Sequence, residues 1–335
     1  MLADGAPYVT IGGKQVGRIG DPVSCGSTVM EGEASVVIGD QGGEKWGREF
    51  AFSLVKNAKD KLVLCLPEMA AAQAERENVD NRQGWIYLHD FVVKWLSKRS
   101  YIIPDADKFN LGGQEPTLIE WDWLMTYKRF RDAADELTTE KYLTEANAKK
   151  KLTEILENDG TFSEQVTFFD HTVLPKDKSG KIDWEELRKH AFHGKTVSHS
   201  KMLAPDKKPI PDGLTAAMGS LTVYALAAGE THVSATGEKR IVIRKIGRFV
   251  YDGFDFSGDQ WLGNWECSEE YKGFKSADAS LEFPVDLIGK ELGLSSRLDN
   301  RAFRNFRNRT GYGFDFRVIC LPDVVNIDEF SYIVP

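Results

Sequence analysis

The sequence predicts an α+β protein with a short N-terminal β-hairpin segment at residues 1–45, a helical middle region at 46–158 and a C-terminal α+β domain at 159–335. Three observations support this division. Short β-branched runs separated by glycine turns fill the first forty residues. Apolar residues then recur at helical spacing through the middle of the chain. Beyond residue 160, two long β-branched stretches, a helix and a closing strand predict helices packed on a mostly antiparallel sheet.

The N-terminal segment alternates β-branched runs with tight turns. The runs are Tyr8–Ile11 and Val36–Ile38, and the turns fall at Gly12-Gly13, Gly20-Asp21, Gly26 and Gly32. Glycine takes positive φ without strain, so this punctuation predicts short strands that fold back every few residues.

The middle region contains one expected strand and three expected helices. The run Lys61–Pro67 predicts a strand or buried turn that ends at the proline. The expected helices begin at Ile86 and stop before Ile102, then cover Thr117–Leu137 and Thr139–Glu157, the last with Thr139 as N-cap. A helical stripe is far more often core than a partner groove, so no chemistry is assigned to this region.

The C-terminal domain has a clear sequence of elements. A short helix at Asp183–Phe192 begins with a capping-box-like pair, Asp183 and Glu186. The later elements are strands at Ser220–Glu230 and Lys239–Asp252 joined by a turn at Gly237, a helix at Asn300–Arg309, a strand at 314–322 and an edge strand at the C-terminus.

Composition excludes several classes of protein. At 335 residues the chain is long enough for two cores, and 41% hydrophobic with 28% charged residues is normal for a globular protein. No apolar run approaches the ~20 residues of a membrane span, and the start has no Sec-type signal. A net charge of −8 argues against a stable nucleic-acid complex for the molecule as a whole, although a local basic patch stays open. Cys25, Cys65, Cys267 and Cys320 lie far apart, which predicts reduced, mostly buried thiols without a structural disulfide.

The densest group of carboxylates follows the second long strand, in the run D-G-F-D-F-S-G-D. Asp252, Asp255 and Asp259 at a strand end can face one cleft, where they bind a divalent ion or divide acid and base roles. The alternative is that they accept backbone N–H bonds in a turn. Trp261 could wall a substrate groove beside them, or belong to the core.

A second G-F-D-F segment occurs at residues 313–316. The repeat predicts that the two copies lie side by side and bring Asp255 and Asp315 together, either as paired catalytic carboxylates or as two similar strand starts. The helix between them carries Arg301, Arg304 and Arg307 on one face. Arg304 and Arg307 are candidates for binding a substrate phosphate. An equal alternative is that these arginines neutralise acidic neighbours at the protein surface.

Histidines form the third candidate group, with His171, His190, His193 and His199 inside one short stretch. His171 is the preferred catalytic candidate, because it follows an aromatic run that predicts partial burial. Together with Asp170 these residues could support metal or nuclease chemistry, whereas a surface position is the usual outcome for a single histidine. The sequence does not identify a cofactor, and a divalent metal is the one that these side chains could bind.

The opening segment resembles the PAAR family, the conical β domains that cap the spike of the bacterial type VI secretion system. The matching runs are G-G-K-x-V-x-R-x-G-D at 12–21, P-V-x-C-G at 22–26 and E-G-x-x-x-V-x-I-G at 31–39. PAAR tips usually hold zinc with three histidines and a cysteine. Here only Cys25 matches a ligand position, since the first histidine is His89. The N-terminal half of the module is also missing, so the segment is either a shortened remnant that docks by its strands or part of a longer protein. A plain β-hairpin leading into an ordinary enzyme is the alternative.

The C-terminal half looks like an uncharacterised cargo domain found behind PAAR-type tips. The matching runs are F-D-H at 169–171, P-D-x-L-T-A-A-M-G at 211–219, F-D-F-S-G-D-Q-W-L-G-N-W at 254–265 and F-R-N-F-R-N-R-T-G-Y-G-F-D-F at 303–316. A fainter likeness to colicin M-type bacteriocins, which cleave a peptidoglycan precursor, comes from D-x-F-D at 252–255. Trp261-Leu262 stand where that family has His-Arg, which removes its proposed proton carrier.

These resemblances imply an antibacterial type VI effector, secreted from the bacterial cytoplasm into a target cell. We expect a C-terminal hydrolase toxin acting on a cell-envelope substrate, with a VgrG-type spike trimer, a cognate immunity protein and a chaperone or adaptor as partners. Two alternatives stay open. One is a metal-dependent nuclease acting in the cytosol, and the other is a non-enzymatic binding or membrane-perturbing toxin.

Overall fold

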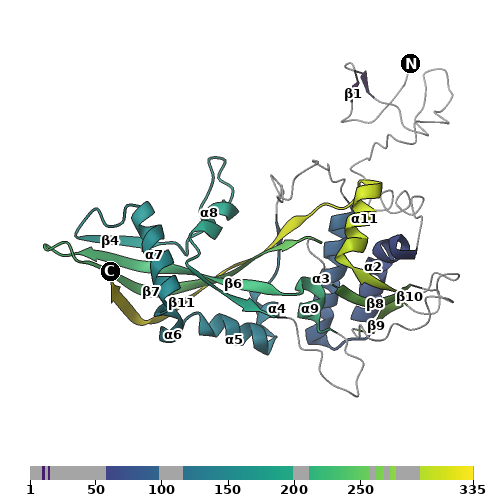
Figure 1. Ribbon diagram of the computed structural model, residues 1–335, viewed down its shortest axis with the longest axis horizontal. Coiled ribbons are helices and arrows are strands. Elements are labelled where there is room, and N and C mark those ends of the chain that lie inside the picture. Colours follow the sequence, from purple (N-terminus) through teal and green to yellow (C-terminus); the bar gives the residue numbers. More distant parts are fainter. Residues whose placement is uncertain are drawn as a thin grey trace. The chain divides into compact units, whose positions relative to one another are not determined.

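The computed structural model describes residues 10–11, 14–15, 58–97, 116–198, 211–256, 261–267, 272–276 and 295–334. It confirms the α+β class, with helices and a mostly antiparallel mixed sheet. The chain divides into two compact units, Met1–Val55 and Lys56–Pro335. Elements from both the predicted middle region and the predicted C-terminal domain pack together in the second unit (Figure 1). A domain boundary at residue 159 therefore stays a prediction.

In the first unit the described residues form a small hairpin. β1 (Thr10–Ile11) pairs antiparallel with β2 (Lys14–Gln15), and Thr10 lies opposite Gln15. These two strands pair where the sequence predicts the first glycine turn, and Gly12-Gly13 themselves lie outside the described residues. The other expected turns and the run Val36–Ile38 lie outside the described residues.

The second unit contains the remaining described elements. Its helices are α2 (Ala58–Ala74), α3 (Val79–Leu96), α4 (Trp121–Met125), α5 (Lys128–Glu136), α6 (Glu140–Leu143), α7 (Ala146–Asn158), α8 (Trp184–Lys189), α9 (Gly213–Met218) and α11 (Asn300–Thr310). Its strands are β3 (Thr117–Leu118), β4 (Val166–Asp170), β5 (His193–Val197), β6 (Leu221–Val233), β7 (Lys239–Phe254), β8 (Trp261–Cys267), β9 (Lys272–Ser276), β10 (Ser295–Asp299) and β11 (Phe316–Ile333).

The larger sheet is built around the long strands β6, β7 and β11. Its strand order is β3-β11-β7-β6-β4, and β5 also pairs with β6. All of these pairs are antiparallel except β3–β11. β6 and β7 are the predicted hairpin, and Gly237 in their turn has φ +84°. The C-terminal residues extend β11 along β7, as expected for a last strand.

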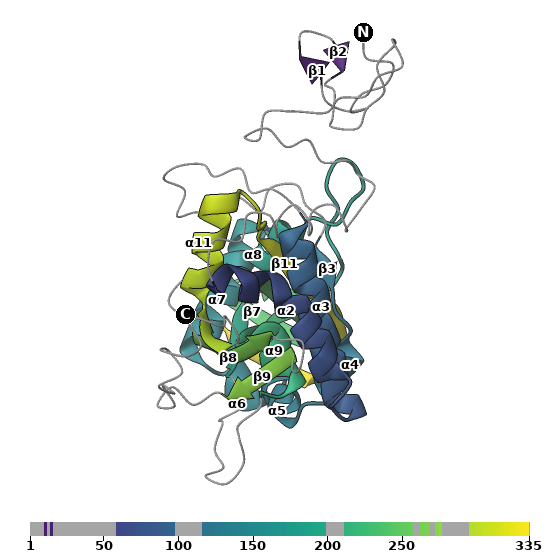
Figure 2. The same ribbon diagram turned by 90° about the vertical axis from the view of Figure 1, so that its right-hand side faces the viewer.

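A smaller sheet, with strand order β10-β8-β9, contacts α2 (Figure 2). Cys65 of α2 and Cys267 of β8 form a disulfide, with their Cα atoms 6.4 Å apart. The expectation of wholly reduced cysteines is therefore wrong. Both cysteines are buried, as predicted. They lie 202 residues apart in the sequence, so the sequence alone could not show that the fold packs one against the other. Cys320 is free and buried.

The run Lys61–Pro67 is helical, which corrects the predicted strand or turn. It lies inside α2, and each residue from Leu62 to Leu66 is buried. A helix buried on all sides has no amphipathic period, so a short apolar run cannot be told from a strand by pattern alone. The next helix, α3, is confirmed, and its N-cap Asn78 accepts a hydrogen bond from Asn81 N.

The expected helix at Thr117–Leu137 is broken. Thr117 and Leu118 form the short strand β3 beside β11, and a turn at Thr126-Tyr127 separates α4 from α5. Its predicted inward positions are nonetheless all buried: Trp123, Tyr127, Phe130, Ala134 and Leu137. The third predicted helix is likewise divided into α6 and α7, with Leu152, Ile155 and Leu156 buried.

Two elements that matter for function lie on the large sheet. Leu187 of α8 belongs to a core cluster with Leu226, Phe249 and Tyr251 of the sheet. α7 is tied to the end of β11, where the Tyr332 hydroxyl donates to Lys149 O at 3.2 Å. Both helices lie by the part of the sheet that includes β4 (Figure 1).

Candidate metal centre

The two G-F-D-F segments lie side by side, as predicted. Phe254 at the end of β7 is paired with Phe316 at the start of β11, and their rings stack with centroids 5.2 Å apart. Asp255 and Asp315 are one residue beyond this pair on their strands. The pairing comes from the antiparallel register, which the repeated sequence alone could only suggest.

Asp315 and the arginines of α11 are engaged within the fold. Nη1 of Arg307 donates to both carboxylate oxygens of Asp315, at 2.9 and 2.8 Å, and Trp95 Nε1 donates to one of them at 3.0 Å. Nη1 of Arg304 donates to Phe256 O at 2.7 Å. These contacts tie α11 to the strand ends. Catalysis by Asp315 and phosphate binding by Arg304 and Arg307 stay predictions, and the structure adds a structural role for each.

Asp252 is the predicted carboxylate with the most unusual environment. Its Oδ1 accepts a hydrogen bond from Gly253 N at 2.9 Å. Burial raises the pKa of Asp252 to about 6, and the charge of Asp255 acts in the same direction. The side chains of Asp255 and Arg317 both lie beside Gly253, with Asp255 Oδ2 2.8 Å and Arg317 Nη1 3.5 Å from the position that a Cβ atom would take there. With a pKa of about 6, a fraction of the Asp252 carboxyl groups stays protonated near neutral pH, which is compatible with the predicted acid role. Asp259 and the Trp261 side chain lie outside the described residues, whereas Trp265 is buried in the core.

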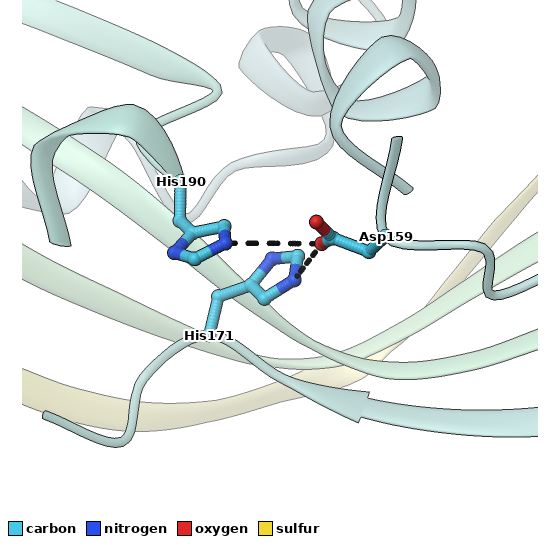
Figure 3. Close-up of side chains that lie close together, drawn as sticks. All are labelled: Asp159, His171 and His190. Atoms are coloured by element: carbon cyan, nitrogen blue, oxygen red, sulfur yellow. Dashed lines mark hydrogen bonds and ion pairs between the residues drawn. The ribbon is translucent and has the colours of Figure 1, made fainter. Parts of the chain in front are cut away.

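The structure brings His171 together with two residues from other elements. His171 follows β4, and its backbone N–H donates to Ala227 O at 3.1 Å, which continues the pairing with β6. Asp159 is the C-cap of α7, and His190 is the C-cap of α8. The cluster therefore lies where three elements end, and each residue points toward the other two (Figure 3).

Both imidazole rings approach the same carboxylate oxygen. Nε2 of His171 lies 2.9 Å from Oδ2 of Asp159, and Nε2 of His190 lies 3.8 Å from it (Figure 3). The rings stack with centroids 4.4 Å apart. The side chains of His171, His190 and Asp159 are 10%, 19% and 33% exposed, so the carboxylate side of the cluster is the more open one.

The electrostatics favour a neutral His171. Burial lowers the pKa of His171, the adjacent His190 lowers it further, and Asp159 opposes both effects. Nδ1 of His171 is buried and has no hydrogen-bond partner among the described protein atoms. The partial burial predicted for this histidine is confirmed, while its catalytic role stays a prediction.

The ligand atoms of Asp159, His171 and His190 all lie within 4.8 Å of one another. Metal–nitrogen and metal–oxygen bonds of about 2.0–2.2 Å in a tetrahedral site place ligand atoms about 3.3–3.5 Å apart. The two measured separations, 2.9 and 3.8 Å, lie on either side of that value. The separations are therefore compatible with two nitrogens and one carboxylate around a divalent transition metal, with a further position left for water. To direct both Nε2 lone pairs at the ion, the two imidazole rings must turn out of their stack.

The sequence-based choice of partners for His171 differs from the arrangement observed. Asp170 accepts hydrogen bonds from the Thr172 backbone and hydroxyl, which makes it a turn-forming residue at the end of β4. His193 is not part of this cluster. Its Nε2 lies 3.2 Å from Glu145 Oε2, and its ring centroid lies 4.9 Å from that of Tyr142. His199 lies outside the described residues. Sequence reasoning missed Asp159 and His190 as partners of His171, because no ligand spacing joins them to it along the chain.

Comparison with known proteins places the chain in a family. The sequence model of a family of unknown function, DUF6402, matches residues 79–330, a range that contains the whole cluster. No curated protein and no solved structure matches the chain. Within the described ranges, no helix has the length and apolar character that a membrane span requires. Since the matched range covers well over half of the sequence, the chain belongs to the DUF6402 family.

Proposed function

We propose that the unit Lys56–Pro335 is a metal-dependent hydrolase whose metal ligands are Asp159, His171 and His190. The observation that carries this proposal is the convergence of the three ligand atoms within 4.8 Å, from the ends of α7, β4 and α8. Two imidazoles and one carboxylate are a ligand set that suits zinc and other divalent transition metals.

The chemistry follows from an incomplete protein ligand set. Three protein ligands leave a coordination position for water, and a catalytic zinc ion lowers the pKa of bound water to about 7. The resulting hydroxide can attack a carbonyl or phosphoryl centre at neutral pH. A neutral His171 is required for such a site, because only the unprotonated nitrogen binds a metal.

An Asp–His base without metal fits the geometry less well. In such a pair the carboxylate holds one ring nitrogen and the other nitrogen takes a proton from substrate or water. Here Nε2 of His171 faces Asp159, and Nδ1 is buried without a partner. The second nitrogen therefore has no access to a substrate, whereas metal binding uses Nε2, the nitrogen that already points into the cluster.

We further propose that this hydrolase is the payload of a type VI secretion effector. The support is the resemblance of residues 12–39 to the PAAR family, together with the cargo-like C-terminal half. The pairing of β1 with β2 is consistent with a tip of short strands. In this proposal a VgrG-type trimer carries the protein and an immunity protein protects the producing cell.

Metal content and toxicity test these proposals separately. The full chain is purified, exposed to Zn²⁺, Mn²⁺ or Co²⁺ and dialysed, and bound metal is measured by mass spectrometry. We expect about one metal per chain, and none in a variant with His171→Gln and His190→Gln. Equal metal content in the two proteins would refute the site.

The effector proposal is tested by inducible expression of the full chain with and without a periplasmic signal. Killing only in the periplasmic form supports an envelope substrate, and killing only in the cytosolic form supports the nuclease alternative. A metal-loaded, folded protein that leaves growth unchanged in both compartments would contradict a toxic role. Recovery with a purified VgrG-type trimer tests delivery independently of toxicity.

A second candidate site for the same hydrolase class is the pair Asp252 and Asp255. The observation in its favour is that Asp252 has a pKa of about 6, which suits a group that donates a proton near neutral pH. Loss of toxicity in Asp252→Asn, with unchanged metal content, would assign the chemistry to this pair.

A further inference from the structure

Glu186 lies at the open side of the cluster, and the ligand set does not use it. It is on α8, one helical turn before His190, so the two side chains lie on the same helix face. Its Oε1 is 3.7 Å from Nε2 of His190, the same nitrogen that faces Asp159. At 39% exposed, the Glu186 side chain is open to solvent.

The local fold orients this carboxylate toward the cluster. The backbone N–H of Glu186 donates to Asp183 Oδ1 at 2.9 Å, which fixes the first turn of α8. Lys189 Nζ donates to Oε2 of Glu186 at 2.8 Å. With one oxygen held by Lys189, the other oxygen faces His190.

The distances leave Glu186 outside the proposed set of metal ligands. In the described part of the chain, the group whose ligand atoms all lie within 4.8 Å contains Asp159, His171 and His190, and it does not extend to Glu186. A carboxylate oxygen that is close to one ligand atom but outside the set can reach water in the remaining coordination position. A hydrogen bond to that water, at about 2.6–3.2 Å, is the geometry that a general base requires.

We infer that Glu186 is the general base of this site. This inference rests on the proposed hydrolase function. Glu186 would accept one proton from a water molecule at the cluster, and the oxygen of that water would form a bond to the carbonyl carbon or phosphorus of the substrate. A divalent metal on Asp159, His171 and His190 would polarise this water. The bond to the leaving group breaks, and the leaving group takes the proton back from Glu186. Water is consumed, and no redox partner is needed.

The contact with Lys189 alone does not explain this arrangement. A surface Lys–Glu pair contributes little to stability, about 0.2–1 kcal/mol, and needs no histidine beside it. Glu154 on α7 provides the matched case: it pairs with Lys150 at 4.0 Å and is 48% exposed. Replacing each glutamate by glutamine removes one lysine-paired carboxylate, but only Glu186 borders the cluster.

The test compares the full-length wild type with Glu186→Gln and Glu154→Gln, each loaded with Zn²⁺. Zinc affinity is measured by chelator competition, and hydrolysis is measured with p-nitrophenyl acetate and bis(p-nitrophenyl) phosphate over pH 5–9. We expect Glu186→Gln to bind zinc within about 2-fold of wild type. Its kcat should fall about 100-fold or more, the usual contribution of a general base. The loss should appear in kcat while KM and zinc affinity stay close to wild type, a division that a purely structural role would not produce.

The outcomes separate the two claims. A zinc-loaded wild type that hydrolyses neither ester refutes the hydrolase proposal and, with it, this inference. Wild-type activity that survives in Glu186→Gln overturns only the role of Glu186. Loss of zinc binding in Glu186→Gln would make this residue a ligand and would also overturn the inference. Glu154→Gln should match wild type in all three measurements, and thermal unfolding verifies that each variant is folded.

Discussion

The imidazole rings of His171 and His190 stack with their planes 15° apart, although one follows a strand and the other ends a helix. Two imidazolium ions at this separation would repel each other. The stack is therefore stable when at least one ring is neutral, which agrees with the lowered pKa of His171. For both Nε2 atoms to bind one cation, the rings would have to turn out of this stack, because a nitrogen lone pair lies in the plane of its ring.

Asp159→Asn should abolish tight metal binding. Loss of an outer-shell partner alone costs about 10–100-fold in affinity, and loss of a charged ligand should exceed about 100-fold. Chelator competition with Zn²⁺ measures the effect. Asp170→Asn is the matched control, because Asp170 bonds Thr172 and should leave affinity within about 2-fold. Equal losses in the two variants would show that Asp159 has no special role.

The metal-free protein should lose stability as the solution becomes acidic. The folded-state pKa of His171 lies below its unfolded value of about 6.5. Its contribution is therefore fully present above about pH 6.5 and is lost as pH falls through the folded value. Urea unfolding between pH 8 and 5 measures this slope. His171→Gln should flatten it, whereas His232→Gln, outside the cluster, should leave it unchanged. An identical slope in His171→Gln would contradict the assignment.

Asp252→Asn should stabilise the protein at alkaline pH. Because burial raises the pKa of Asp252 to about 6, its contribution to stability is present below about pH 4 and is lost as pH rises through 6. Asparagine keeps the acceptor for Gly253 N without the charge. The free energy of unfolding should rise by roughly 1–3 kcal/mol at pH 8, and the gain should vanish near pH 4. A variant that is less stable than wild type at pH 8 would rule out a costly buried charge.

Reduction should weaken the packing of the small sheet against α2. The Cys65–Cys267 disulfide closes a long loop, and removing a bridge of this kind costs about 2–5 kcal/mol. Thiol titration of the unfolded chain should find two more thiols after reduction than before it. Cys65→Ser with Cys267→Ser should melt at the temperature of the reduced wild type. Four thiols before reduction would show that the bridge does not form.

Local signals in the sequence predicted much of the second unit. Alternation and the Gly237 turn identified the β6–β7 hairpin, and the Asp183 cap identified α8. The repeated G-F-D-F motif predicted that its two copies lie side by side, and the register then pairs Phe254 with Phe316. Each of these features depends on near neighbours in the chain or on a direct repeat, which are properties that a single sequence displays.

The candidate site depends on long-range docking, which a single sequence does not display. Asp159 and His190 match no ligand spacing with His171, and they meet only because α7 and α8 end close to the end of β4. The nearer residues Asp170 and His193 were the natural choices from spacing. At the end of β4, the Asp170 carboxylate accepts a hydrogen bond from the backbone N–H of Thr172. On β5, the His193 side chain lies beside Glu145.

The origin of the three ligands has a consequence for folding. A newly made chain holds Asp159, His171 and His190 on separate segments, so a cation could join them only after those segments have assembled. An ion with no affinity for the unfolded chain would then add its binding free energy to the free energy of unfolding, by linking α7, β4 and α8. Chelation should consequently loosen this corner first, and amide exchange in these elements should accelerate before exchange in α2 and α3.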